Sequence, residues 1–62
     1  MRIVQHFTID NRAVTRYANN LVEVCRYSPS GRETISWSHT YLSSETAEMG
    51  FNVMKAEIKS NA

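Results

Sequence analysis

Three side chains in this sequence could bind a soft metal ion, namely His6, Cys25 and His39. Zinc sites in proteins use about four ligands, commonly in pairs a few residues apart. None of the three has another ligand at that spacing, and the chain has a single cysteine. The sequence therefore predicts no metal site, and it contains no cofactor or nucleotide motif that we would rely on.

A nucleophilic triad could be assembled from serine, histidine and aspartate, and the residues available are Ser36, Ser38, His39 and Asp10. A working triad also needs a strained nucleophile turn and an oxyanion hole, which a Gly-x-Ser-x-Gly sequence or a glycine-rich loop would supply. The chain has neither. A small two-layer domain also has little room for a substrate pocket. We therefore predict that the protein is not an enzyme.

Four arginines could lie together on a predicted sheet beside the only tryptophan. Arginine contacts phosphate or guanine through two hydrogen bonds, and an aromatic ring can stack on a base. The nucleic-acid-binding candidates are Arg12, Arg16, Arg26, Arg32 and Trp37. Solvated surface charges, some paired with Glu23 or Glu33, are the alternative explanation.

The C-terminal segment contains a second set of apolar residues that a core on one side cannot use. At 100° per residue, Met49, Val53 and Ala56 fall opposite the main apolar stripe of a helix, and Asn52 lies beside them. Scattered exposed apolar residues are common on soluble proteins. The functional alternative is a contact surface for a partner protein or a second copy, with Met49 as an adaptable side chain.

The elements that must position these residues are centred on a β-hairpin between Leu21 and Leu42. Two runs rich in β-branched and aromatic residues flank Ser28-Pro29-Ser30-Gly31, which has the residue preferences of a turn. Alternation in the second run places Ile35, Trp37, His39 and Tyr41 on one face.

The register of this hairpin stays open between two alternatives. A four-residue loop would pair Val24 with Ile35, Val22 with Trp37, and Arg26 with Glu33. A three-residue loop with a glycine bulge would instead align Leu21, Cys25 and Tyr27 with the face of Ile35 and Trp37. We favour the first register, because the second places Glu23 on the face of Trp37.

The remaining segments are a strand, an ambiguous stretch and a helix. Residues 2–9 alternate as a strand and end at Asp10-Asn11, while residues 12–20 fit a short strand and a short helix equally well. A helix is expected after the capping residues Ser43-Ser44. Its core-facing stripe is Ala47, Phe51, Met54 and Ile58. Gly50 lies beside this stripe, where close approach of the helix to the sheet or simple tolerance would explain it.

From Arg12 to Lys59, this order of elements resembles the three-stranded DNA-binding domain at the amino terminus of phage and transposon integrases, a shape shared with the plant ethylene-response type. The matching pieces are Val22–Tyr27, the turn with Pro29 and Gly31, Thr40-Tyr41-Leu42, and Thr46-Ala47-Glu48. In that family, basic and aromatic residues of the sheet read the major groove of DNA. The resemblance implies that Arg16, Arg26 and Trp37 would do so here.

Length and charge set the outer limits. A chain of 62 residues forms one domain, 1–62, and is near the lower limit for folding without a staple or a partner. The net charge of +1 is far from that of a typical nucleic-acid binder. The start lacks the apolar run of a signal peptide, and no stretch reaches membrane-spanning length. The lone cysteine fits a reducing interior, so we expect the cytoplasm.

Together these observations predict an α+β fold, with an antiparallel sheet of three to four strands and one C-terminal helix packed across it. We expect a small non-catalytic binding or regulatory protein of the adaptor or inhibitor type, acting through contact with another protein. A homodimer is also expected, because self-association would bury surplus apolar surface. The alternative is a nucleic-acid-binding module that uses arginines on the sheet. No membrane partner is expected.

Overall fold

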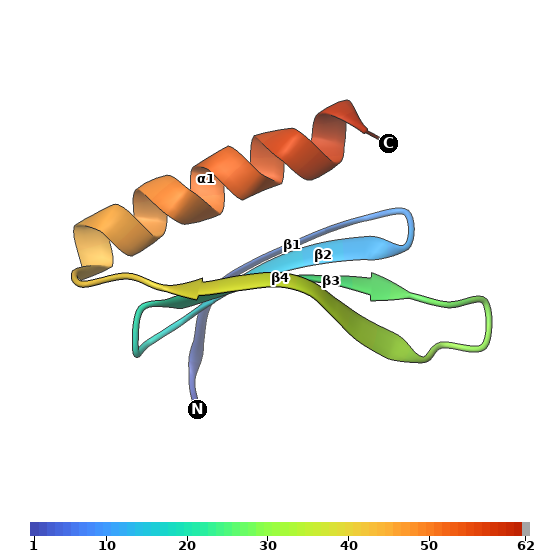
Figure 1. Cartoon of the computed structure of the whole chain (residues 1–62), viewed down its shortest axis with the longest axis horizontal. Helices are drawn as coiled ribbons and strands as arrows, with labels where there is room; N and C mark the ends of the chain where they lie inside the picture. The colour runs from blue at the N-terminus through green and yellow to red at the C-terminus, as the bar shows by residue number, and fades with distance from the viewer. Residues whose placement is uncertain (62) are drawn as a thin grey trace.

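The computed structural model describes residues 1–61 and contains four strands and one helix (Figure 1). The elements are β1 (Ile3–Ile9), β2 (Arg12–Tyr17), β3 (Leu21–Tyr27), β4 (Glu33–Thr40) and α1 (Ser44–Ser60). The strands form one antiparallel sheet in the order β1-β2-β3-β4, and α1 packs across one face. The predicted α+β fold is confirmed, with four strands.

The ambiguous segment after Asp10-Asn11 is a strand rather than a helix. Ile9 pairs with Arg12, so only Asp10 and Asn11 connect β1 to β2, and Asp10 has a φ of 52°. Asn20 has a φ of 71° in the turn between β2 and β3. Aspartate and asparagine tolerate this left-handed conformation better than most residues do. Two tight turns thus force the intervening segment to run antiparallel to both neighbours.

The predicted turn at Ser28-Pro29-Ser30-Gly31 is present, but the favoured hairpin register is wrong. The backbone N–H of Gly31 donates to the carbonyl of Ser28 over 2.8 Å, and Gly31 has a φ of 86°. Ser28 N–H donates to the carbonyl of Arg32 over 2.9 Å, so the loop has three residues, and the alternative register holds from the turn as far as the pair of Cys25 with Ile35. The observed pairs are Tyr27 with Glu33, Arg26 with Thr34, Cys25 with Ile35, Val24 with Trp37, and Val22 with His39.

A β-bulge at Ser36 explains this register. Continued without interruption, the pairing at Tyr27 and Glu33 would set Trp37 opposite Glu23, on the face away from the helix. The extra residue shifts the phase by one, and Trp37 returns to the helix side. Ile35 stays on the opposite face and is 48% exposed. The expectation that Ile35 shares the face of Trp37 is therefore wrong.

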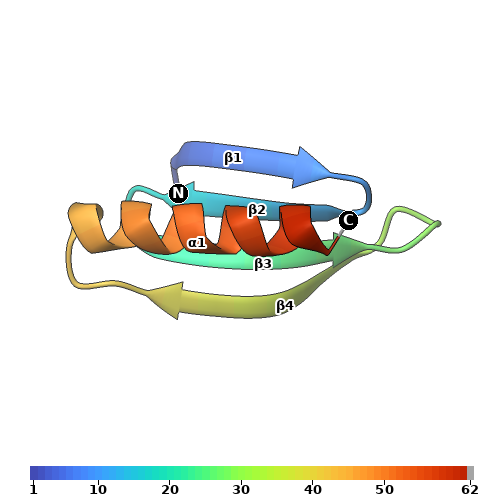
Figure 2. The ribbon, with the colours of Figure 1, turned by 90° about the horizontal axis from the view of Figure 1, so that it is seen from above.

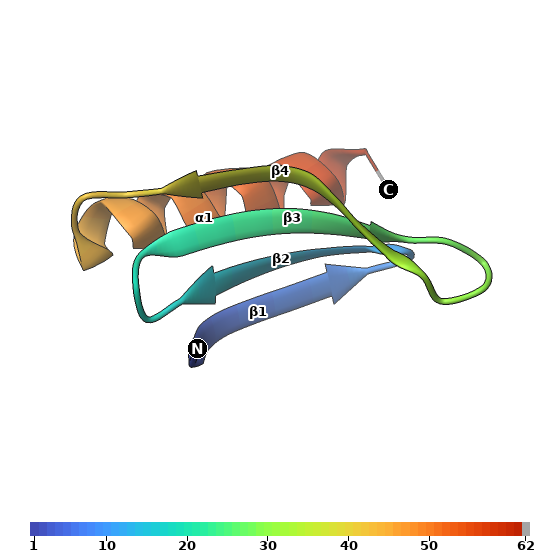
Figure 3. The same ribbon diagram turned by 60° about the horizontal axis from the view of Figure 1, so that its bottom comes forward.

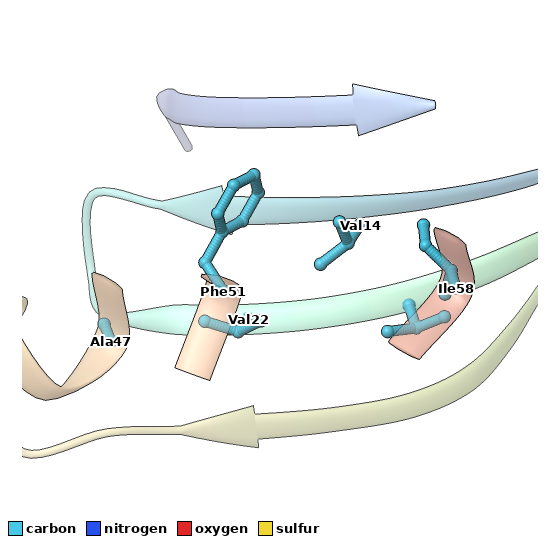
Figure 4. Packing of buried hydrophobic residues seen from close by; sticks show 6 residues of the cluster. Val14, Val22, Ala47, Phe51 and Ile58 are labelled. Carbon is cyan, nitrogen blue, oxygen red and sulfur yellow. The ribbon is translucent and has the colours of Figure 1, made fainter. Parts of the chain in front are cut away.

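The hydrophobic core lies between α1 and the two central strands (Figure 4). Its buried members are Val14, Val22, Val24, Ala47, Phe51 and Ile58, and the partly buried residues around them are Phe7, Ile9, Trp37, Tyr41 and Met54. The predicted helix stripe is thus confirmed. Burial of each large apolar side chain contributes about 1.5–3 kcal/mol.

The start of α1 is fixed by its cap. The Ser43 side chain accepts the backbone N–H of Thr46 over 3.2 Å, and the Thr46 hydroxyl accepts the N–H of Ser43 over 3.3 Å. This reciprocal arrangement satisfies two backbone donors at the helix start. From there the helix runs above β2 and β3, and β4 lies to one side of it (Figure 2).

The second face of the sheet is open (Figure 3), since none of the residues 1–61 forms a layer over it. Ala13, Thr15 and Cys25 are nevertheless buried there, because they are small and lie on the two central strands. The open face also carries Glu23 and Glu33. The molecule therefore has one face partly covered by a helix and one face available to solvent.

Candidate binding groove

An open apolar groove lies between α1 and β4, because the helix does not extend over that edge strand (Figure 2). It encloses about 450 Å³ and is lined by Trp37, Tyr41, Thr46, Met49, Gly50, Val53 and Met54. Trp37 forms part of the floor, opposite Val24 of β3. Met49 and Val53 come from the side of α1 that faces β4, and they are 62% and 64% exposed.

Three rings from β4 and the residue just after it form a row along this groove. Trp37 stacks on His39 with ring centroids 6.3 Å apart, and His39 meets Tyr41 edge-on at 4.5 Å. Alternation along the strand after the bulge places all three on the helix side. Tryptophan and tyrosine, at the two ends of the row, are enriched at protein contact sites.

Gly50 allows this geometry at the end of the groove near the start of α1. A Cβ atom on Gly50 would lie 2.7 Å from Cε2 of Tyr41, and closer still to the Cζ and hydroxyl of the same ring. The Tyr41 ring thus occupies the space that a side chain on α1 would fill. Of the two explanations considered for this glycine, a close approach is present, although the partner is the ring of Tyr41, just after β4, rather than the sheet itself.

Toward the end of α1 the groove becomes polar. A second space of about 490 Å³ is lined by Arg12, Val24, Arg26, Ser36, Trp37, Met54, Glu57, Ile58 and Asn61. Trp37 and Met54 line both spaces, so the two are adjacent, and the second is the polar end of what we call the groove. Arg12 and Arg26 are directly opposite each other on β2 and β3. Like charges in such a pair repel, and the lining of this space has two arginines against one carboxylate, that of Glu57, so its charge favours an anion.

Of the predicted protein-contact residues, the structure brings Met49 and Val53 together with Trp37 in the lining of the groove. Ala56 is exposed at the top of α1, and Asn52 is exposed on the side turned toward β1; neither lines the groove. The contributions of Tyr41, Thr46 and Glu57 were not predicted. Tyr41 was placed on the correct face from the sequence, and Gly50 was the signal that its ring needs space.

Of the predicted nucleic-acid candidates, Arg12, Arg26 and Trp37 line the polar end of the groove. Arg16 lies on the same helix-facing side, where its Nε donates to Oε1 of Gln5 over 2.5 Å. Arg32 belongs to the connection before β4. Among the described strands, the open face therefore carries no arginine, and the three strand arginines, Arg12, Arg16 and Arg26, are on the side of the sheet that carries α1.

The residues weighed as metal ligands or as a triad do not come together. Cys25 lies on the open face and His39 on the helix side, while His6 Nδ1 is hydrogen-bonded to the Thr15 hydroxyl at 2.9 Å. Asp10 is in the turn after β1, remote in the sheet from β4. Within residues 1–61, no three potential ligands are close enough to hold a metal ion.

The shifted pKa values belong to the open face. Tyr17 donates to Oε1 of Glu23 over 2.8 Å, and this hydrogen bond raises the pKa of Tyr17 to about 12. Burial raises the pKa of the Cys25 thiol, which favours the unreactive protonated form. A hydrogen bond to Cys25 raises the pKa of Tyr27. Each shift favours the neutral form, so none activates a nucleophile.

The chain matches no protein-family model, and no curated protein or solved structure shows significant similarity to it. No helix among the described residues is long and apolar enough to span a membrane. Functional inference therefore depends on the groove itself.

Proposed function

We propose that this is a small cytoplasmic, non-catalytic binding protein of the adaptor or inhibitor type, and that the groove between α1 and β4 contacts another protein. The observation that carries the proposal is the exposure of Met49 and Val53 beside the aromatic row that begins at Trp37. Apolar surface gathered in one place is typical of an interaction site, whereas single exposed apolar residues are not.

The composition of the groove supports a protein ligand. Protein contact sites are enriched in tryptophan, tyrosine, methionine and arginine, and all four occur here. Trp37 is also partly packed against the core, so its ring is held in place before a ligand arrives. A rigid aromatic anchor loses little entropy on binding, which is the property of binding hot spots.

A capture experiment tests this proposal. The tagged protein, Met49→Glu and Val53→Glu would each be incubated with lysate treated with nuclease, and the bound proteins compared. We expect both substitutions to abolish capture of a partner that the unmodified protein retains. Asn52→Glu is the matched control, because it adds the same charge to the other side of α1. Equal capture by all four proteins would refute the groove as the contact site.

A second copy of the chain is one partner to be distinguished. Sedimentation over a range of protein concentrations would show whether the unmodified protein self-associates. If it does, Met49→Glu should return it to a monomer and remove the concentration dependence of its melting temperature.

Nucleic acid binding is a second candidate function, and one observation favours it. Arg12, Arg26 and Trp37 line the same end of the groove, where a base could stack on the indole while the arginines contact phosphate. The chain has a single tryptophan, so its fluorescence reports on this site. Quenching by an oligonucleotide that weakens steeply with added salt would support this function. No quenching at low salt would exclude it.

A further inference from the structure

We propose that the occupant of the groove is an amphipathic α-helix of a partner protein, carrying carboxylates at the end that lies over Arg12 and Arg26. This inference depends on the proposed function and specifies the chemistry of the ligand. It follows from the layer arrangement, the interruptions in the edge strands, and the charge at one end of the groove.

The helix layer has room for a second helix. Neighbouring strands are about 4.8 Å apart and a helix with its side chains is about 10 Å across, so one helix covers about two strands. α1 lies above β2 and β3, which leaves β4 uncovered on the helix side (Figure 2). A helix beside α1 would lie along the groove, with its apolar stripe against the row from Trp37 to Tyr41.

α1 itself has the two apolar sides that such a position requires. One side, with Ala47, Phe51 and Ile58, is buried against the sheet. The other presents Met49 and Val53, which are four residues apart and therefore lie above one another on the side facing β4. A helix that packs only on a sheet needs the first side alone. The second side would be buried by a neighbouring helix.

An extended strand added to the sheet edge fits less well. Both edge strands are interrupted by a bulge, at Ser36 in β4 and at Val4 in β1. Bulges are one of the means by which proteins prevent strand addition at a sheet edge. A strand beyond β4 would also lie in the plane of the sheet and would leave Met49 and Val53 uncovered.

The arginines at the polar end of the groove favour acidic residues at the end of the partner helix that lies over them. The polar end is lined by Arg12, Arg26 and a single acidic residue, Glu57. The two arginines face each other across neighbouring strands, and a carboxylate between them would relieve their repulsion. An acidic turn placed there therefore binds better than a neutral one.

A second copy is less suitable as the occupant. Its α1 already uses the stripe of Ala47, Phe51 and Ile58 against its own sheet, and it could offer only Met49 and Val53. A stable dimer commonly buries about 800 Å² per subunit, and the whole surface of this protein is 4199 Å². The groove is a minor part of that surface, so it suits a single helix better than a subunit.

Designed peptides provide the test. The probe is a helical peptide as long as α1, with leucine at i, i+3, i+4 and i+7 and glutamate in one terminal turn. A matched peptide has glutamine in place of glutamate, and a third has proline at its centre to prevent helix formation. Binding is followed by Trp37 fluorescence and by amide chemical shifts of the labelled protein.

We expect the glutamate peptide to shift amides of α1 and β4 and to bind about two- to fivefold more tightly than the glutamine peptide. Met49→Glu and Val53→Glu should each weaken binding by about tenfold or more, whereas Asn52→Glu should leave it unchanged. Arg26→Glu should reverse the preference, so that a peptide with lysine in that turn binds more tightly.

The results that overturn the inference are separate from those that overturn the proposed function. If the proline peptide binds as well as the helical one, the occupant is extended. If the glutamate and glutamine peptides bind equally, the arginines do not select it. If no peptide binds but Met49→Glu still abolishes partner capture, the groove is a protein site and the helical occupant is wrong. If capture is also unaffected, both proposals fail.

Discussion

Replacing Gly50 with alanine should destabilise this protein, although the same change in the interior of most helices is stabilising. Alanine is favoured over glycine in a helix by about 1 kcal/mol. The added Cβ would lie 2.7 Å from Cε2 of Tyr41 and closer to the end of that ring. Overpacking of this kind costs about 1–3 kcal/mol. We therefore expect a net loss of up to about 2 kcal/mol.

The size of this loss in the free energy of unfolding depends on how far the Tyr41 ring can move. Tyr41 is partly buried beside the core and has no strand partner on its far side, so its ring can turn toward solvent. That movement relieves the contact but gives up apolar burial. A net loss of about 1 kcal/mol lowers the melting temperature of a domain this small by about 4–8 °C.

A double-mutant cycle makes this reasoning refutable. Urea denaturation would be measured for Gly50→Ala, Tyr41→Ala and the double variant. In the Tyr41→Ala background the ring is absent, so Gly50→Ala should stabilise the protein by about 1 kcal/mol. The sign of the same substitution thus reverses between the two backgrounds. If Gly50→Ala stabilises the protein equally in both backgrounds, the position of the Tyr41 ring does not require a glycine at residue 50.

Three further predictions concern the turns, the cap and the open face. Asn20→Val should lower the free energy of unfolding by about 1–2 kcal/mol in urea denaturation, because β-branched residues disfavour the positive φ at this position; Asn20→Gly should cost nothing, and equal losses for both would contradict this reason. Ser43→Ala should cost about 1 kcal/mol in thermal unfolding, because it removes the acceptor for the backbone N–H of Thr46, whereas Ser43→Asp should retain the cap. The hydrogen bond to Glu23 raises the pKa of Tyr17 from 10.0 to about 12 in the folded protein, so the stability that this bond contributes is full below pH 10 and is lost as the pH rises toward 12. A phenolate absorbance titration should show this late ionisation, and Glu23→Gln should move the pKa of Tyr17 back toward the usual value.

The sequence by itself determined the local elements. The residues between Ser28 and Gly31 specify a turn, alternation specifies the strands on either side of it, and Ser43 specifies the start of a helix. The spacing of Ala47, Phe51 and Ile58 determined which side of α1 is buried. These features are readable because each depends on residues close together in the chain.

The tertiary structure decided what depends on competition between distant residues. Residues 12–20 had no preference of their own, and pairing with strands on both sides made residues 12–17 strand β2, while residues 18–20 became the turn before β3. The bulge at Ser36 could not be predicted from alternation. It turns Trp37 toward the core, and the free energy of burying this ring offsets the loss of regular pairing at the bulge.

The candidate site was divided in the same way. The sequence identified Met49 and Val53 as surplus apolar residues on α1 and Trp37 as a large aromatic residue on β4. Their meeting in one groove depends on the lateral position of α1 above β2 and β3, which no local pattern encodes. Arg12 and Arg26 likewise reach the polar end of this groove only because β2 and β3 pair in a register that places them opposite each other. Packing and register are set by the sum of contacts over the whole sheet, so the groove exists only in the folded chain.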